Sequence, residues 1–355
     1  MIEFVGVTKR YPDGTVAVDA LDLVVEAGKV TVFVGPSGCG KTTSLRMINR
    51  MIDATAGRIL IDGRDITEID PAQLRRGIGY VIQNAGLFPH RTILDNIATV
   101  PRLVGWSKTK ARARAAALME IVGLDPALAK RYPAQLSGGQ QQRVGVARAL
   151  AADPPILLMD EPFSAVDPVV RESLQDELLR LQSELGKTIV FVTHDIDEAI
   201  KLGDKVAVFR VGGKLAQYDE PGTLLARPAD GFVDGFVGRD RGYRGLGFTF
   251  ADVPLGELPT VQLGAPAAPG WRLVVDAEQR PTGWLPGGLP AEPGNVVPGG
   301  SLHDVTSGTL RSALDAALSS PSGLGVAVDA EGRVAGAIAA DEVLAALDRR
   351  RAAVS

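Results

Sequence analysis

The stretch Gly35-Pro-Ser-Gly-Cys-Gly-Lys-Thr-Thr43 constrains the fold of this chain more than any other feature. It follows an apolar run, Val30–Val34, and precedes a run with helical character, Ser44–Arg50. A glycine-rich loop in this position turns backbone N–H groups toward one point, where the positive end of the next helix adds to them. The pattern predicts a phosphate-binding loop and therefore a nucleotide site.

The residues of this loop have different expected roles. Lys41 supplies a positive charge for the β- and γ-phosphates, and Thr42 supplies a hydroxyl ligand for Mg²⁺. Cys39 contributes its backbone N–H, and the positive surroundings are expected to lower the pKa of its thiol. The predicted phosphate contacts are Gly35, Pro36, Ser37, Gly38, Cys39, Gly40, Lys41, Thr42 and Thr43.

Length and composition narrow the class of protein. At 355 residues the chain is expected to form about two domains. One cysteine excludes an intrachain disulfide framework and fits a reducing compartment. No uninterrupted apolar run approaches the roughly 20 residues of a membrane span, and the first residues do not resemble a signal peptide. A net charge of −4 without a long basic tract argues against nucleic acid as the main partner.

From Met1 to Val237 the chain alternates β-branched runs with amphipathic segments, which is typical of an α/β fold with a parallel sheet flanked by helices. A helical subdomain is predicted at about 92–152, with one amphipathic helix over Lys108–Val122. The expected strands are Val30–Val34, Gly79–Ile82, Ile156–Met159, Thr188–Thr193 and Lys205–Arg210.

After Val237 the composition changes. Residues 238–250 are rich in glycine and predict a flexible linker, and residues 251–355 predict a small α+β domain. Two segments of that domain, Leu273–Leu285 and Val326–Ile338, resemble each other as strand, acidic turn and strand. Helices are expected on either side of the second copy, at Leu310–Leu318 and Asp341–Leu347, whereas the first copy has Pro/Gly-rich sequence instead of its second helix.

Two carboxylates follow the apolar strand at Ile156–Met159. Asp160 is placed to hold Mg²⁺, directly or through water, and Glu161 to orient and deprotonate an attacking water. An Asp-Glu pair after a strand can also be a solvated turn. The phosphate loop favours the catalytic interpretation.

Upstream of this strand lies Leu136-Ser-Gly-Gly-Gln140, followed by Gln141–Arg148. Taken alone, the pentapeptide could be a helix start capped by Ser137. In this order of motifs, the chain resembles the nucleotide-binding subunit of an ATP-binding-cassette (ABC) transporter. The resemblance implies a homodimer in which Ser137, Gly138, Gly139 and Gln140 contact the γ-phosphate of ATP held by the opposing subunit.

The resemblance covers about Met1–Val237 and implies four further site residues. Gln83 would lie at Mg²⁺ and the attacking water, and His194 would bind the γ-phosphate and hold the attacking geometry. Asp167 would belong to the loop that links the two sites of the dimer. Tyr11 would stack on adenine, although a tyrosine packed on a surface turn is the simpler alternative.

The resemblance also implies transport. The chain would be a peripheral ATPase on the cytoplasmic face of the cell membrane, working with integral-membrane permease subunits and a substrate-binding protein. Met47–Ile52, Asp65–Thr67 and the tandem tail are similar to the ATPases of glycine betaine/carnitine/choline importers, which carry paired cystathionine-β-synthase-type (CBS) domains. An amino-acid importer remains one alternative, and a soluble ABC ATPase acting on nucleic acid or ribosomes is another.

Overall fold

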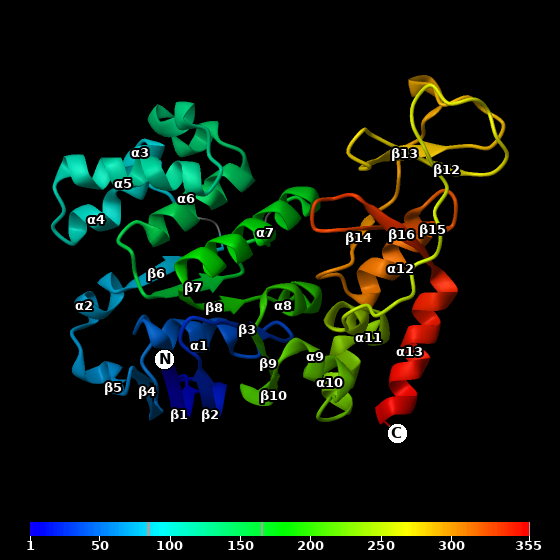
Figure 1. Ribbon diagram of the computed structural model, residues 1–355. Helices are drawn as coiled ribbons and strands as arrows, with labels where there is room; N and C mark the ends of the chain where they lie inside the picture. Colours follow the sequence, from blue (N-terminus) through cyan, green and yellow to red (C-terminus); the bar gives the residue numbers. More distant parts are fainter. Residues whose placement is uncertain (84–85, 165, 355) are drawn as a thin grey trace. The chain divides into compact units, whose positions relative to one another are not determined.

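The computed structural model describes residues 1–83, 86–164 and 166–354. The chain divides into two compact units, Met1–Val237 and Gly238–Ser355 (Figure 1). Within the described residues, no helix combines the length and the apolar character needed to cross a bilayer.

A six-stranded sheet organises the first unit, in the order β10-β9-β3-β8-β7-β6. Five of its strands run parallel, and β10 pairs antiparallel with β9 at one edge. The strands are β3 (Val30–Val34), β6 (Ile78–Val81), β7 (Ile156–Asp160), β8 (Thr188–Val192), β9 (Lys205–Arg210) and β10 (Lys214–Asp219). The predicted parallel sheet is thus present. Its strands are continuous apolar runs because both faces of the sheet are covered.

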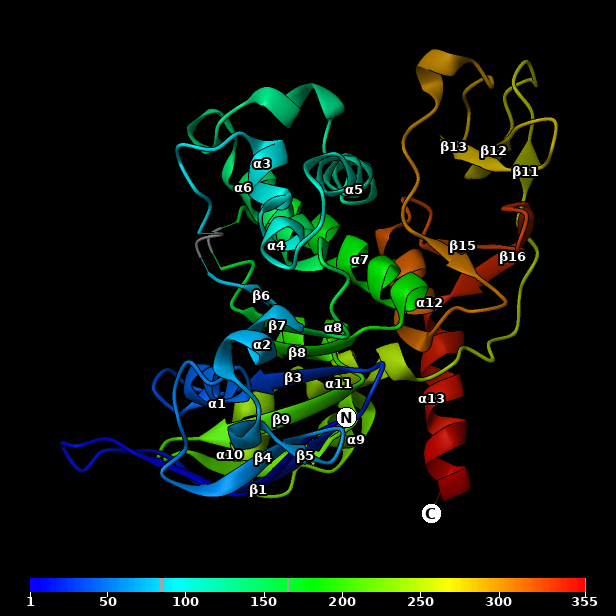
Figure 2. The same ribbon diagram turned by 90° about the vertical axis from the view of Figure 1, so that its left-hand side faces the viewer.

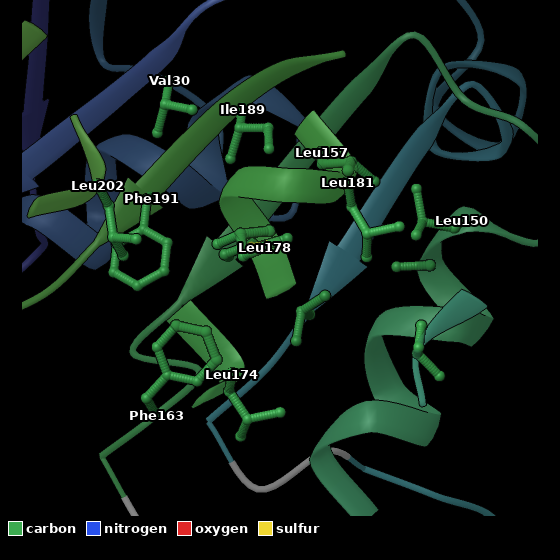
Figure 3. Packing of buried hydrophobic residues seen from close by; sticks show 14 of the residues in the cluster. Val30, Leu150, Leu157, Phe163, Leu174, Leu178, Leu181, Ile189, Phe191 and Leu202 are labelled. Atoms are coloured by element: carbon green, nitrogen blue, oxygen red, sulfur yellow. The ribbon is translucent and has the colours of Figure 1, made fainter. Parts of the chain in front are cut away.

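One face of this sheet is covered by helices. Side chains two apart on a strand point to the same face, so Leu157 and Met159 of β7 face one side while Leu158 and Asp160 face the other. Figure 3 shows α7 (Pro168–Leu185) laying Leu174, Leu178 and Leu181 over the first of these faces. Helices α5 (Lys108–Ile121) and α6 (Gly138–Leu150) contribute to the same core.

The opposite face packs against α1 (Lys41–Ile48) and a second sheet. Leu45, Met47 and Ile48 of α1 share a core with Leu158 of β7 and with Phe4 of the second sheet. That sheet has the order β2-β1-β4-β5 and is antiparallel throughout. Its strands are β1 (Ile2–Arg10), β2 (Val16–Val25), β4 (Ala56–Ile61) and β5 (Arg64–Asp65). The helix that follows the phosphate loop is therefore held between two sheets.

The region predicted as a helical subdomain contains helices between β6 and β7, and the predicted helix over Lys108–Val122 is observed as α5 (Lys108–Ile121). Figure 2 shows α3 to α6 grouped together, apart from α1. The helices of this group are α3 (Ile93–Ile97), α4 (Thr99–Leu103), α5 and α6 (Gly138–Leu150). The remaining helices of the unit are α2 (Pro71–Arg76), α8 (Ile196–Leu202), α9 (Pro221–Ala226) and α10 (Gly231–Val237).

The second unit contains two three-stranded sheets of the same design. In each sheet the first and second strands are parallel, and the second and third form an antiparallel hairpin. The strands are β11 (Thr260–Val261), β12 (Arg272–Val275) and β13 (Pro281–Leu285), then β14 (Leu302–Asp304), β15 (Leu324–Val328) and β16 (Val334–Ala339). Helices α12 (Leu310–Ser319) and α13 (Ala340–Val354) accompany the second sheet. The α+β composition is as expected, and the likeness to CBS domains stays a prediction.

The segment predicted as a flexible linker contains helical turns. Residues Arg241–Gly245 form α11, and a 3₁₀ turn, η4, follows at Leu246–Phe248. Leu246 is only 9% exposed and packs with Leu310 of α12. Glycine content alone does not predict these helical turns, because burial of one leucine is enough to hold the turn against the core of the unit.

Candidate nucleotide site

The phosphate loop joins β3 to α1 through glycines in the left-handed region. Gly38 has φ +77° and Gly40 has φ +96°. A side chain at Gly40 would collide with the carbonyl oxygen of Ala17, so only glycine fits there. Gly40 caps α1 without a side-chain hydrogen bond, which leaves the first N–H groups of the helix available to an anion.

Lys41 has its ammonium group inside the loop. Its Nζ donates to the carbonyl oxygen of Gly35 at 2.7 Å and to that of Pro36 at 2.9 Å. The residue is only 5% exposed. A cation held at the centre of an anion-binding loop is what phosphate recognition requires.

The thiol of Cys39 corrects one expectation. The residue is fully buried, and burial raises the pKa of the Cys39 thiol, opposed by the nearby charge of Lys41. The predicted lowering is therefore wrong, because desolvation of a thiolate outweighs the positive potential of the loop. The Cys39 N–H donates to the carbonyl of Pro36 at 3.4 Å and so faces into the turn.

Thr42 and Asp160 come together from two elements. The Thr42 hydroxyl donates to Oδ1 of Asp160 at 2.8 Å. Asp160 ends β7 on the face that packs on α1, and its side chain is 8% exposed. A hydroxyl and a carboxylate are hard oxygen donors of the kind that Mg²⁺ prefers. Within the described ranges, no group of three or more His, Cys, Asp or Glu could hold a metal ion.

Two residues around Asp160 were not predicted. The Tyr80 hydroxyl donates to Oδ2 of Asp160 at 3.3 Å, and the guanidinium of Arg46 lies 3.5 Å from the same oxygen. Burial and the charge of Asp160 raise the pKa of Tyr80, so its phenol keeps its proton. The four-residue spacing of Thr42 and Arg46, which puts both on one face of α1, is the sequence signal that could have revealed Arg46.

Glu161 directly follows β7 and is paired with a histidine. Its N–H donates to the carbonyl of Val192, and its φ of +47° is unusual for a residue with a side chain. Oε2 of Glu161 lies 3.2 Å from Nδ1 of His194, which follows β8. The His194 side chain is 59% exposed and that of Glu161 24%. The ends of two neighbouring parallel strands thus present an acid and an imidazole together.

Gln83 and Tyr11 are less closely tied to these groups. Gln83 is exposed just beyond β6, the strand that pairs with β7. Tyr11 lies in the turn after β1, half-buried, with the ammonium of Lys9 5.3 Å from its ring centroid. Both roles remain predictions.

Ser137 begins α6 in a capping box. Its hydroxyl accepts from the N–H of Gln140, and Oε1 of Gln140 accepts from the N–H of Ser137. A side chain on Gly139 would come within 2.8 Å of Val170, which follows exposed Asp167 by three residues. Helix α6 packs in the core on one face of the sheet, and α1, which follows the phosphate loop, packs on the other face. Contact of Ser137, Gly138, Gly139 and Gln140 with a γ-phosphate stays a prediction.

Comparison with known proteins places this geometry in a family. A family profile described as "ABC transporter" matches residues 18–164. The glycine betaine/carnitine/choline transport ATP-binding protein OpuCA of Bacillus subtilis is 53% identical over 241 residues, covering 68% of this chain and 63% of OpuCA. The glycine betaine uptake system ATP-binding protein YehX of Escherichia coli is 51% identical over 239 residues, covering 67% of this chain and 77% of YehX.

A solved structure has the same fold. The ATP-binding cassette MJ0796, in a dimeric post-hydrolysis state bound to ADP and Pi, is 34% identical with a TM-score of 0.57, over 62% of this chain and 99% of that one. The fold and the relatives define a P-loop ATP-binding cassette. The chain belongs to the family of ABC transporter ATP-binding proteins. The chain spans 63% of the length of OpuCA, so the similarity concerns that part of OpuCA and not the whole protein.

Proposed function

We propose that this chain is the ATP-hydrolysing subunit of an ABC importer for a quaternary-ammonium osmolyte such as glycine betaine, carnitine or choline. The main structural support is the pairing of Glu161 with His194 beside the Thr42–Asp160 contact. The substrate class is supported by 53% identity to a glycine betaine/carnitine/choline transport protein over 241 residues. The family profile matches residues 18–164, which lie within the unit that contains the site.

Phosphate binding would fall to the loop and α1. Lys41 would turn its ammonium from the carbonyls of Gly35 and Pro36 toward the β- and γ-phosphates, an exchange of neutral for charged acceptors. Thr42, Asp160 and Gln83 would hold Mg²⁺, which supplies charge neutralisation on the phosphates when bound. The hard oxygen set of Thr42 and Asp160 supports this assignment.

Glu161 would act as general base on the attacking water. A carboxylate at a strand end has access to a water in the site, and the imidazole of His194 beside Oε2 restricts how that carboxylate can rotate. His194 would also donate to the γ-phosphate. General-base catalysis of this kind contributes on the order of 10²–10⁴ in rate.

Two copies of the chain would be needed for each complete site. Helix α6, which Ser137 begins, packs on the sheet face opposite α1, which supports a second subunit as the source of the Ser137–Gln140 segment. Its helix start and the Ser137 hydroxyl would then face the γ-phosphate. The dimeric state of MJ0796 supports a homodimer.

The other partners are proposed on the same grounds. Integral-membrane permease subunits and a substrate-binding protein would complete the importer, with this chain peripheral on the cytoplasmic face of the membrane. The repeated β-sheet design of the second unit supports a CBS-like regulatory role.

Uptake of radiolabelled glycine betaine and choline by cells with and without the gene tests the proposal. We expect uptake to be lost on deletion, restored by the wild-type gene and not restored by Glu161→Gln. Unchanged osmolyte uptake together with lost amino-acid uptake would instead support the amino-acid importer. Intact uptake of both solutes, with the protein bound to nucleic acid or ribosomes, would overturn transport.

A further inference from the structure

The carboxylate of Asp160 has a partner on each oxygen. Thr42 contacts Oδ1 at 2.8 Å, whereas Oδ2 is contacted by the Tyr80 hydroxyl at 3.3 Å and by the Arg46 guanidinium at 3.5 Å. The proposed hydrolysis uses Thr42 and Asp160 but gives no task to Tyr80 or Arg46. Since the side chain of Asp160 is 8% exposed, these protein groups, and not bulk water, fix its orientation.

The fold explains why these residues meet. Thr42 and Arg46 are one helical turn apart on α1 and face the same strand. Tyr80 of β6 pairs with Leu158 of β7, and Asp160 lies two residues further along the same face. Tyr80 is therefore a diagonal neighbour of Asp160 across two parallel strands. The contact of Tyr80 with Asp160 follows from the strand register, and that of Arg46 follows from the face that α1 turns toward β7.

We propose that Tyr80 and Arg46 are positioning residues for Asp160, holding Oδ2 so that Oδ1 and the Thr42 hydroxyl are aimed at a bound divalent cation. The inference rests on the proposed function. A carboxylate that is already oriented loses less rotational freedom when it becomes a ligand, or accepts from a metal-bound water, so the cation binds more tightly. Groups that orient metal ligands in this way typically change metal affinity by 10- to 100-fold when removed.

The test measures Mn²⁺ binding to the full-length protein with a non-hydrolysable ATP analogue, by electron paramagnetic resonance. Tyr80→Phe should raise the Mn²⁺ dissociation constant about tenfold. Binding of the analogue in EDTA should stay unchanged, because Tyr80 contacts the metal ligand and not the phosphate loop. The matched control is Tyr218→Phe, which removes a hydroxyl that donates to the carbonyl of Val24 at 2.7 Å, and should bind Mn²⁺ like wild type.

Arg46 separates positioning from simple charge. If Arg46 acted only as a nearby cation, Arg46→Gln would tighten Mn²⁺ binding by removing repulsion. Positioning predicts weaker binding, partial recovery in Arg46→Lys, and a double variant with Tyr80→Phe that is less than additive. Arg46 has a 44% exposed side chain, so its variants should fold even if Tyr80→Phe does not.

Wild-type Mn²⁺ affinity in Tyr80→Phe, or tighter binding in Arg46→Gln, would overturn the positioning role and leave the proposed ATPase intact. Failure of the wild-type protein to bind Mn²⁺ with the nucleotide analogue would overturn both.

Discussion

Both units place carboxylates directly after buried strands, but they use them differently. In the first unit Glu161 follows β7 and contacts His194 from the neighbouring strand end. In the second unit Asp329 follows β15 and is taken up within its own hairpin, where Oδ1 accepts from the N–H of Glu331 and of Arg333 and Oδ2 pairs with the Arg333 guanidinium at 2.8 Å. Asp276 repeats the pattern after β12, accepting from the N–H of Arg280.

The difference lies in the connections between strands. Parallel strands end at the same edge and are joined by long crossovers, so their terminal side chains meet one another. A hairpin returns at once, and its acid satisfies the N–H groups of the turn. Carboxylates that follow the parallel strands of the first unit are therefore expected to take part in ATP hydrolysis. Those in the hairpin turns of the second unit are expected to stabilise the fold.

The largest expected effect tests this contrast with one change in each unit. Glu161→Gln should lower ATP turnover on the order of 10²- to 10⁴-fold and retain ATP binding, because it removes the base while keeping the shape of the site. It should also stabilise the ATP-bound dimer. Asp329→Asn is the matched control and should leave turnover unchanged. Steady-state phosphate release measures both, and turnover of Glu161→Gln near the wild-type rate would refute its role.

Mixing two inactive variants tests Ser137, which begins a helix and does not lie at the end of a strand. Lys41→Ala and Ser137→Arg should each be inactive as homodimers. Random exchange of subunits makes half of the dimers mixed, each with one intact site, so the mixture should regain about a quarter of wild-type turnover. No recovery after exchange, with mixed dimers shown by mass spectrometry, would mean that Ser137 does not complete the partner's site.

Alkylation tests the buried thiol of the phosphate loop. The chain has one cysteine, so iodoacetamide labelling reports Cys39 alone. Because burial raises the pKa of Cys39 and excludes the reagent, labelling of the folded protein should be at least about tenfold slower than in urea. Equal rates in the two conditions would show that the loop opens freely.

The smallest effect concerns Asp304 in the second unit. Hydrogen bonds from Thr306 and Ser307 lower the pKa of Asp304 to about 2. Since the folded pKa lies below the unfolded value of 3.8, its contribution to stability is present above about pH 4 and is lost as the pH falls toward 2.

Between about pH 4 and pH 2, the melting temperature of Asp304→Asn should therefore fall less than that of the wild type, by on the order of 1–2 °C. Two of the three tryptophans, Trp271 and Trp284, belong to this unit, so tryptophan fluorescence follows its thermal unfolding. Exposed Glu257→Gln is the control. Identical profiles for Asp304→Asn and wild type would contradict the assignment.

Much of the first unit could be predicted from the sequence because its parallel strands are continuous apolar runs and its loop residues have few other uses. The antiparallel sheet was not predicted. Register shifts in β1 between Phe4, Val7 and Lys9, together with Gly6 at φ +56°, interrupt the strict alternation that identifies a strand. Tyr80 was missed because its contact with Asp160 depends on the register of two strands far apart in the sequence. The spacing of Thr42 and Arg46 places both on one face of α1, but it does not say which strand that face contacts.

The backbone of Glu161 has a consequence for how this protein would evolve in the laboratory. A φ of +47° disfavours any residue with a Cβ by about 1 kcal/mol and suits glycine. Glu161→Gly is then expected to melt at a higher temperature than the active enzyme. Selection for heat resistance alone would drive this position toward an inert protein, so a screen for robust variants has to demand turnover at every round.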